Sequence, residues 1–176
     1  IGQVLAAAGH RVCLTDTDAT ALGSALGRVT RNLEEAAVDA APVLARLRTT
    51  ASLADAVQGV DLVIEAVAEV VALKQDLFAE VAALAPPHAI LASNTSVIPI
   101  TRLGARLDDE ARRRLVGTHW WNPPHLIPLV EVIRTAWTGA EVVDQVVTLL
   151  RDAGKTPVVV HRDVTGFIGN RLNQAM

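Results

Sequence analysis

The sequence is poor in cysteine and carries neither a basic block nor a long apolar run. Cys13 is its single cysteine, which excludes an internal disulfide and a zinc site built from cysteines. A net charge of −3 without a basic cluster makes nucleic acid and anionic membranes poor partners. No apolar run reaches the ~18 residues of a membrane span, and the five histidines lack metal-ligand spacing. We therefore expect a cytoplasmic protein that acts on a small molecule without a metal.

Hydrophobic residues nonetheless make up 51% of the 176 residues, which favours one α/β domain whose strands are buried on both faces. Apolar runs typical of strands alternate with segments of helical spacing. The predicted strands cover 11–15, 46–49, 61–67, 89–93, 114–120, 128–134 and 157–161. The predicted helices cover 1–8, 19–38, 52–58, 70–84, 107–113, 139–153 and a segment after Gly166. This alternation predicts an α/β fold with a doubly wound, mostly parallel sheet of the Rossmann type.

Asp16 ends the first predicted strand, which follows a helix and a turn at Gly9. In the second half of a dinucleotide-binding unit, a carboxylate at this place accepts hydrogen bonds from ribose hydroxyls and repels a 2′-phosphate. Asp16 therefore predicts NAD as the cofactor, although an ordinary acid at a strand end is the alternative. The first strand and the Gly-rich turn of such a unit should lie just before Ile1 and are not among the 176 residues. We expect the chain to begin inside the unit and to end inside a helix.

Polar residues also follow two later strands, where ligands bind in an open parallel sheet. Glu65 and Glu69 lie in and after the strand over 61–67, and the sequence SNTS over 93–96 follows the strand over 89–93. Helix caps and a solvated loop acid are the alternatives.

The most informative segment is GTHWWNPPHLIPLVEV over 117–132. His119 ends one predicted strand and Glu131 lies in the next, so two adjacent strands can place them side by side. A carboxylate bound to one ring nitrogen orients the imidazole, so that the other nitrogen can take a proton from an alcohol as its hydride leaves. Glu131 also sits in an apolar run, where a charge is costly unless it is paired. We expect the two side chains to lie within hydrogen-bond distance; a purely structural pair is the alternative.

Four motifs in order, SNTS, HWWNPP, LVEV and DVTGFIGNRL, closely resemble those of the 3-hydroxyacyl-CoA dehydrogenases. The resemblance extends over essentially the whole chain. It implies an NAD-binding domain over 1–164, with 165–176 beginning a helical second domain that completes the acyl site and a homodimer. It also implies hydride transfer between NAD and the C3 hydroxyl of a 3-hydroxyacyl-CoA.

The resemblance also assigns roles to particular residues. His119 becomes the general base and Glu131 its partner. Ser96 and Asn170 become the groups that contact the reacting oxygens. The cofactor contacts that it implies are Asp16, Glu69, Lys74, Ser96 and Asn122.

The sequence departs from the family pattern in ways that bear on the substrate. The GxGxxG turn and the second domain do not occur in the 176 residues, so we expect weak NAD binding and no turnover from this chain alone. WNPPHLIPLVEV also resembles gulonate and carnitine dehydrogenases and lambda-crystallin. Where the fatty-acid enzymes place a CoA-contacting basic residue, over 32–39, we find only Asn32 and Asp39. A CoA thioester is the favoured substrate; a small free hydroxy acid and a non-catalytic, crystallin-like role are the alternatives.

Overall fold

The strands of the protein form two sheets in a computed structural model that describes residues 1–175. The smaller sheet pairs two parallel strands, β1 (Val12–Thr15) and β2 (Leu47–Thr50). The larger sheet has five strands in the order β3-β4-β5-β6-β7. These strands are β3 (Leu62–Glu65), β4 (Ile90–Ser93), β5 (Leu115–Trp120), β6 (Leu129–Ile133) and β7 (Thr156–Val160). All neighbouring pairs run parallel except β5 and β6, which are antiparallel.

The helices fall where the hydrophobic spacing predicts them, with short additions. They are α1 (Gly2–Ala7), α2 (Ala19–Glu35), α3 (Ala41–Leu44), α4 (Leu53–Val57), α5 (Val71–Leu84), α6 (Ile100–Leu103), the 3-10 helix η1 (Gly104–Arg106), α7 (Asp109–Arg113), α8 (Ala140–Asp152) and α9 (Gly169–Ala175). The sequence did not predict α3, α6 or η1, which have three or four residues each. Such short turns carry too little periodicity to be recognised.

Helix α2 is shorter than its predicted range of 19–38. It begins where the Asp18 side chain accepts hydrogen bonds from the amides of Thr20 and Ala21. It ends at Glu35 because Ala37 takes a left-handed conformation, with φ 55°. That reversal lets the amide of Val38 donate back to the carbonyl of Leu33 at 2.9 Å, which closes the helix end.

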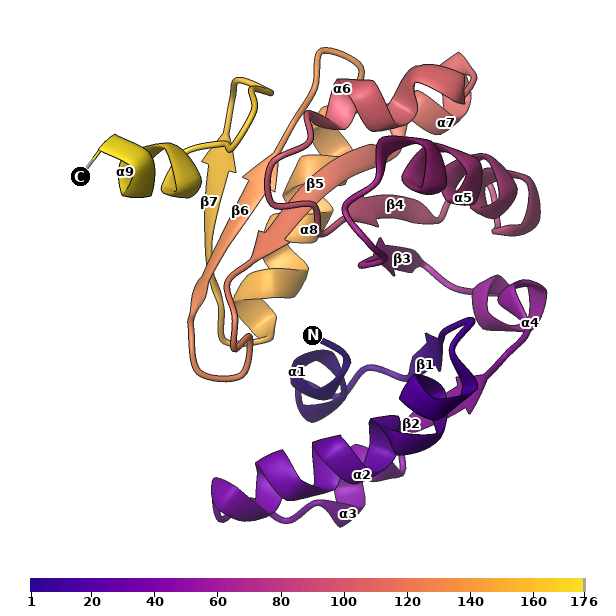
Figure 1. The fold of residues 1–176 in the computed structure, drawn as a ribbon, viewed down its shortest axis with the longest axis vertical. Coiled ribbons are helices and arrows are strands. Elements are labelled where there is room, and N and C mark those ends of the chain that lie inside the picture. The colour runs from indigo at the N-terminus through magenta and orange to yellow at the C-terminus, as the bar shows by residue number, and fades with distance from the viewer. Residues whose placement is uncertain (176) are drawn as a thin grey trace.

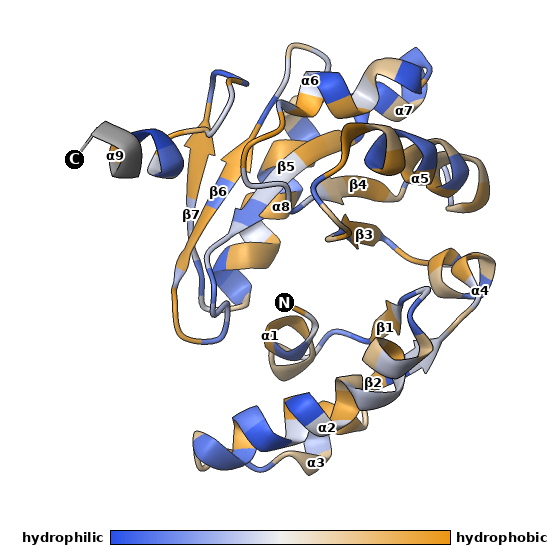
Figure 2. Ribbon diagram, viewed as in Figure 1, coloured by the Kyte–Doolittle hydropathy of each residue, from blue (hydrophilic) through white to orange (hydrophobic). Residues whose placement is uncertain are grey.

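Helices cover both faces of the larger sheet, as the doubly wound prediction requires (Figure 1). Successive residues of β4 point to opposite faces, and Leu91 packs in a cluster with Phe78 of α5 and Ile100 of α6. Ile90 and Ala92 pack on the other face in a cluster that includes residues of α8 and α1. Figure 2 shows hydrophobic residues concentrated in the strands, while α2, α7 and α8 carry hydrophilic residues. The fold is therefore a Rossmann-like α/β sandwich.

Within residues 1–175, β1 pairs only with β2, and β3 pairs only with β4. Figure 1 shows the N-terminus between the two sheets, with α1 beside it. Helix α1 packs against both sheets. Leu5 lies in the hydrophobic cluster with residues of α8 and the larger sheet, and Ala6 lies in the cluster with residues of α2, α3 and β2. Leu62, Val63 and Ile64 of β3 are only half-buried, whereas all of β4 is buried. Within the described residues, no strand pairing therefore joins the two sheets.

No helix in the described part of the chain is long and apolar enough to cross a membrane.

Candidate active site

His119 and Glu131 face each other across the antiparallel pair β5–β6. The strand register sets them directly opposite one another, and His119 Nδ1 lies 2.7 Å from Glu131 Oε2. Only 5% of His119 and 2% of Glu131 is exposed. The distance and the shared sheet face agree with the hydrogen bond expected from the sequence. Because Nδ1 is occupied by the carboxylate, Nε2 is the ring nitrogen left for another partner.

Glu131 is anchored on its other oxygen by the backbone that leads into α9. Oε1 accepts hydrogen bonds from the amides of Ile168 at 2.9 Å and Gly169 at 3.0 Å. Burial alone would raise the pKa of Glu131, but hydrogen bonds from His119, Gly169 and Ile168 outweigh it and hold this pKa below its ordinary value. The carboxylate is therefore charged at neutral pH, and its two oxygens tie β5 to the start of α9.

Aromatic rings enclose the imidazole of His119. Its ring centroid lies 5.3 Å from that of Trp121 and 5.9 Å from that of Phe167. Trp120 is buried in the hydrophobic cluster that includes residues of α8. Trp120 and Trp121 therefore contact different parts of the molecule, as expected for successive residues that point to opposite faces of a strand. The rings restrict water around His119 and limit its movement.

Ser96 and Asn170 also come together, although 74 positions separate them. The side-chain amide of Asn170, in the first turn of α9, donates a hydrogen bond to the backbone carbonyl of Ser96 at 2.8 Å. Ser96 is exposed, so its hydroxyl is accessible. Asn170 directly follows Gly169, whose amide binds Glu131. The four residues predicted to be catalytic are thus linked through one set of contacts around the start of α9.

Glu69 and Lys74 lie next to this group and contact each other. Lys74 Nζ is 3.2 Å from Glu69 Oε2 and 2.6 Å from Glu65 Oε1. Glu69 Oε1 in turn accepts hydrogen bonds from the amides of Ser96 at 2.9 Å and Val97 at 3.2 Å. Lys74 is 1% exposed, which places it beneath the surface on which Ser96 lies.

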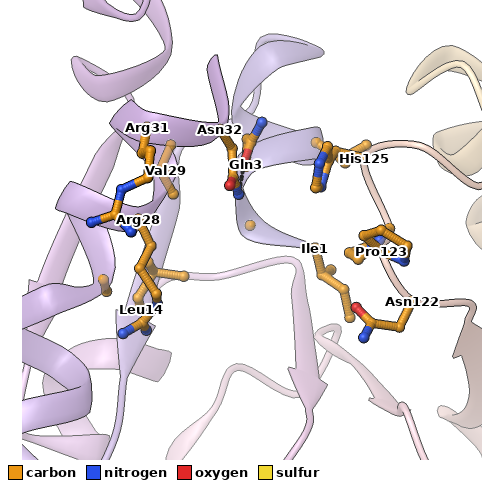
Figure 3. Close-up of a pocket in the computed structure, with 14 residues that line it drawn as sticks. Ile1, Gln3, Leu14, Arg28, Val29, Arg31, Asn32, Asn122, Pro123 and His125 are labelled. Atoms are coloured by element: carbon orange, nitrogen blue, oxygen red, sulfur yellow. Dashed lines mark hydrogen bonds between the residues drawn. The ribbon is translucent and has the colours of Figure 1, made fainter. Parts of the chain in front are cut away.

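The remaining predicted cofactor residues lie elsewhere. Asp16 is exposed directly after β1 on the smaller sheet, where its Oδ1 accepts a hydrogen bond from the amide of Asp18. Asn122 lies in the loop between β5 and β6 and lines a cavity of about 370 Å³. Figure 3 shows Arg28 and Arg31 of α2 on one side of that cavity and Asn122 and His125 on the other.

Glu65 and Ser93, which the sequence places at the ligand-binding edge of the sheet without a specific role, pair with each other beneath the surface. Glu65 is 4% exposed and Ser93 is fully buried, and Ser93 Oγ donates to Glu65 Oε2 at 2.7 Å. Glu65 carries the same signal that singled out Glu131, namely an acid inside an apolar strand, which is stable only if it is paired. Among the described residues, no group of three or more His, Cys, Asp or Glu side chains is arranged to hold a metal.

Known proteins resemble this chain in sequence and in structure. A 5-formyl-3-hydroxy-2-methylpyridine 4-carboxylate 5-dehydrogenase of Mesorhizobium japonicum is 44% identical over 130 residues, which are 74% of this chain and 41% of that protein. A probable 3-hydroxybutyryl-CoA dehydrogenase of Bacillus subtilis is 36% identical, over 98% of this chain and 61% of that protein. The crystal structure of an Escherichia coli K12 3-hydroxybutyryl-CoA dehydrogenase matches with a TM-score of 0.88 at 35% identity, over 97% of this chain and 37% of that one.

This chain spans less than two thirds of the length of each of these relatives. A family model described as the NAD binding domain of 3-hydroxyacyl-CoA dehydrogenase matches residues 1–164. That match covers most of the chain, and the structural neighbours share the Rossmann-like fold described above. The chain therefore belongs to the 3-hydroxyacyl-CoA dehydrogenase family, and it carries that family's NAD-binding domain.

Proposed function

We propose that this chain supplies the NAD-binding and catalytic residues of an oxidoreductase that interconverts a 3-hydroxyacyl-CoA and the corresponding 3-ketoacyl-CoA. The observation that carries the proposal is the buried His119–Glu131 pair, whose carboxylate is anchored on the amides before α9. Ser96 and Asn170 meet beside it. A His119–Glu131 pair that only stabilised the sheet would not need Ser96 and Asn170 beside it, so their presence favours the catalytic role.

In the oxidation, His119 Nε2 takes the proton of the 3-hydroxyl group while the C3–H bond breaks. Bound NAD would supply the acceptor for that hydrogen, which leaves C3 as a hydride. Glu131 holds the ring through Nδ1 and stabilises the imidazolium that forms, because its charge lies 2.7 Å away. In the reverse direction the imidazolium returns the proton to the substrate oxygen. Ser96 and Asn170 orient that oxygen in this proposal.

The residues present fit the adenosine end of NAD. Asp16 is exposed after β1, at the carboxyl end of a parallel strand, and a carboxylate there can accept hydrogen bonds from two neighbouring ribose hydroxyls. Its Oδ1 already accepts the Asp18 amide, which fixes the orientation of the carboxylate. The same charge repels the 2′-phosphate of NADP.

Asp16→Ala is expected to weaken NAD binding by roughly tenfold or more, the effect of losing a hydrogen bond to a charged group. Binding of NADP should change little, so the ratio of the Kd for NADP to the Kd for NAD becomes smaller. Calorimetric titration of both cofactors measures this. Asp18→Ala, which removes a nearby acid that caps α2, is the matched control. A protein that prefers NADP before any substitution would contradict the role of Asp16.

The cavity beside α2 supports a CoA thioester as the substrate. Arg28 and Arg31 line it, whereas the acids Glu34 and Glu35, which would repel phosphate, are not among its lining residues. Arginine binds phosphate oxygens through a fork of N–H donors. Arg28 and Arg31 therefore supply positive charge that the segment over 32–39 lacks. A small free hydroxy acid is the second candidate, favoured by the pyridine-carboxylate dehydrogenase that is 44% identical.

Arg31→Gln is expected to raise the KM for 3-hydroxybutyryl-CoA by roughly ten- to a hundredfold, since one phosphate contact is lost. The KM for the pantetheine thioester of the same acid, which lacks the nucleotide, should stay the same. Both KM values are measured on the longest natural chain that contains these residues. Arg48→Gln on β2, which removes a positive charge that does not line the cavity, is the control.

The same assay compares 3-hydroxybutyryl-CoA with free 3-hydroxybutyrate, gulonate and carnitine. A kcat/KM at least about a hundredfold higher for a free acid, equivalent to about 2.7 kcal/mol, would overturn the choice of CoA. It would leave the roles of His119 and Glu131 intact, because the chemistry at the carbinol carbon is the same.

A further inference from the structure

The turn between β7 and α9, residues 163–169, follows an uncommon backbone path. Gly166 and Phe167 both adopt left-handed conformations, with φ of 76° and 48°. A bulky side chain is rare in that region and persists there only where the surrounding structure holds it. Phe167 is 1% exposed, and its ring centroid lies 5.9 Å from that of His119. The turn therefore needs contacts that fix it beside the catalytic pair.

Asp163, at the beginning of this turn, holds the start of α6. Its Oδ1 accepts a hydrogen bond from the amide of Ile100 at 2.8 Å, and its Oδ2 accepts one from the amide of Thr101 at 2.7 Å. The first amides of a helix have no acceptor within the helix, and Pro99, the residue before α6, makes no side-chain cap. Asp163 thus supplies acceptors that the local sequence lacks, from 63 and 62 positions away.

Helix α6 is in turn fixed to the strand that carries His119. Ile100 is fully buried and packs over Gly117 of β5, where an added Cβ atom would lie 2.8 Å from Ile100 Cδ1. Only glycine allows so close an approach. Gly117 comes two positions before His119. By binding the amide of Ile100, Asp163 therefore ties the turn to β5.

The other end of the turn carries the groups that contact the catalytic residues. The amides of Ile168 and Gly169 donate to Glu131 Oε1. Asn170 follows directly and donates to the carbonyl of Ser96. Ile168 lies only five positions after the aspartate that binds α6. A shift at the beginning of the turn is therefore passed to the carboxylate that holds His119.

Few contacts fix the turn between its two ends. Within residues 1–175, two features join the segment 161–167 to the rest of the protein by hydrogen bonds. One is the pair accepted by Asp163, and the other is the bond from the amide of Gly166 to the carbonyl of Val97 at 3.2 Å. Because Val97 lies in a loop and α6 is packed on the sheet, Asp163 provides the firmer attachment.

We infer that Asp163 is a positioning residue for the catalytic pair: by binding the start of α6, it sets the place of the turn that presents two backbone amides to Glu131 and leads into Asn170. The inference rests on the proposed function, in which Glu131 and His119 act on the substrate. The contacts of Asp163 themselves can be tested without activity. A role confined to stabilising α6 is the alternative that the tests separate.

The first test follows deuterium exchange of backbone amides by mass spectrometry, on the longest natural chain that contains these residues. In Asp163→Ala, the amides of 166–170 should exchange roughly tenfold faster or more, because the turn loses its attachment to α6. Asp108→Ala is the matched control, since Asp108 caps the short helix α7 by accepting the amide of Ala111 at 2.8 Å. It should leave 166–170 unchanged. Unchanged exchange of 166–170 in Asp163→Ala, even with faster exchange of 100–103, would overturn the inference.

The second test measures the Kd for NAD and the kcat per NAD-binding site, so that unfolded protein is not counted. Asp163→Ala should lower this kcat by ~10², the effect of a misplaced reacting group. The Kd for NAD should change less than about threefold, because the proposed adenosine contact of Asp16 lies on the smaller sheet. A kcat within about threefold of the original value, or an equal fall in Asp108→Ala, would overturn the inference.

Asp163→Asn tests for rescue. It keeps one acceptor oxygen and the size of the side chain, so its kcat should lie between those of the original protein and Asp163→Ala. If Asp163→Ala does not fold, Asp163→Asn takes its place, and the same readouts decide. A natural chain without dehydrogenase activity would refute the proposed function, and the exchange measurement would still judge Asp163.

Discussion

Replacing His119 by glutamine is expected to lower kcat by about 10²–10⁴, the usual contribution of a general base. Glutamine can still donate a hydrogen bond to Glu131, so the β5–β6 pair and the contact with α9 should survive. What is lost is a nitrogen that can take the substrate proton. The Kd for NAD should therefore stay close to its original value, and the change should appear in kcat. Steady-state kinetics with 3-hydroxybutyryl-CoA and titration of NAD, both on the longest natural chain that contains these residues, measure the two quantities.

His161→Gln is the matched control for His119→Gln, because His161 lies exposed just after β7. It should keep full activity. A His119→Gln protein that retains more than a tenth of its activity would exclude His119 as the base. If the longest natural chain that contains these residues is inactive before substitution, yet folded and able to bind NAD, that would instead point to the non-catalytic, crystallin-like alternative.

Replacing Glu131 by alanine is expected to lower the free energy of unfolding by roughly 1–3 kcal/mol, the cost of leaving a buried donor without its acceptor. Glu131 is 2% exposed and serves three donors: His119 Nδ1 and the amides of Ile168 and Gly169. His119 Nδ1 would be left buried without an acceptor, and the amides of Ile168 and Gly169, at the partly exposed start of α9, would lose theirs. Urea unfolding followed by tryptophan fluorescence measures the loss.

Glu80→Ala, on the exposed surface of α5, controls for the removal of one carboxylate and should change the unfolding free energy by less than about 0.5 kcal/mol. An equal loss in both variants would show that Glu131 is not a structural anchor.

The same carboxylate predicts how stability depends on pH. The pKa of Glu131 in the folded protein is held below the value of about 4.3 that it has in the unfolded chain. Its stabilising effect is therefore complete above about pH 4.3 and is lost as the pH falls through the lower, folded-state pKa. Acid unfolding curves should show that Glu131→Gln loses less stability than the original protein over this range. Equal acid losses in the two proteins would contradict this assignment.

Local sequence determined most of the secondary structure and the central pair of the site. The strands of the larger sheet lie within two residues of their predicted ends, since each is a short apolar run bounded by turn residues. His119 and Glu131 were predictable as neighbours because the turn between them is short and an acid inside an apolar strand requires a partner. Asp16 was placed at the end of β1 by the same local reasoning.

Contacts between distant segments were beyond the reach of local patterns. Asn170 meets Ser96 from 74 positions away, and Glu131 binds amides 37 and 38 positions further along the chain. No repeat of residue types in the sequence marks contacts over such separations, because they depend on how β6, β7 and α9 pack. Family resemblance grouped the same residues, but only the folded chain shows the contacts that join them. Sequence therefore determined which side chains carry chemistry, while tertiary packing decided which of them reach the surface of the site, because burial and hydrogen-bond partners exist only in the folded chain.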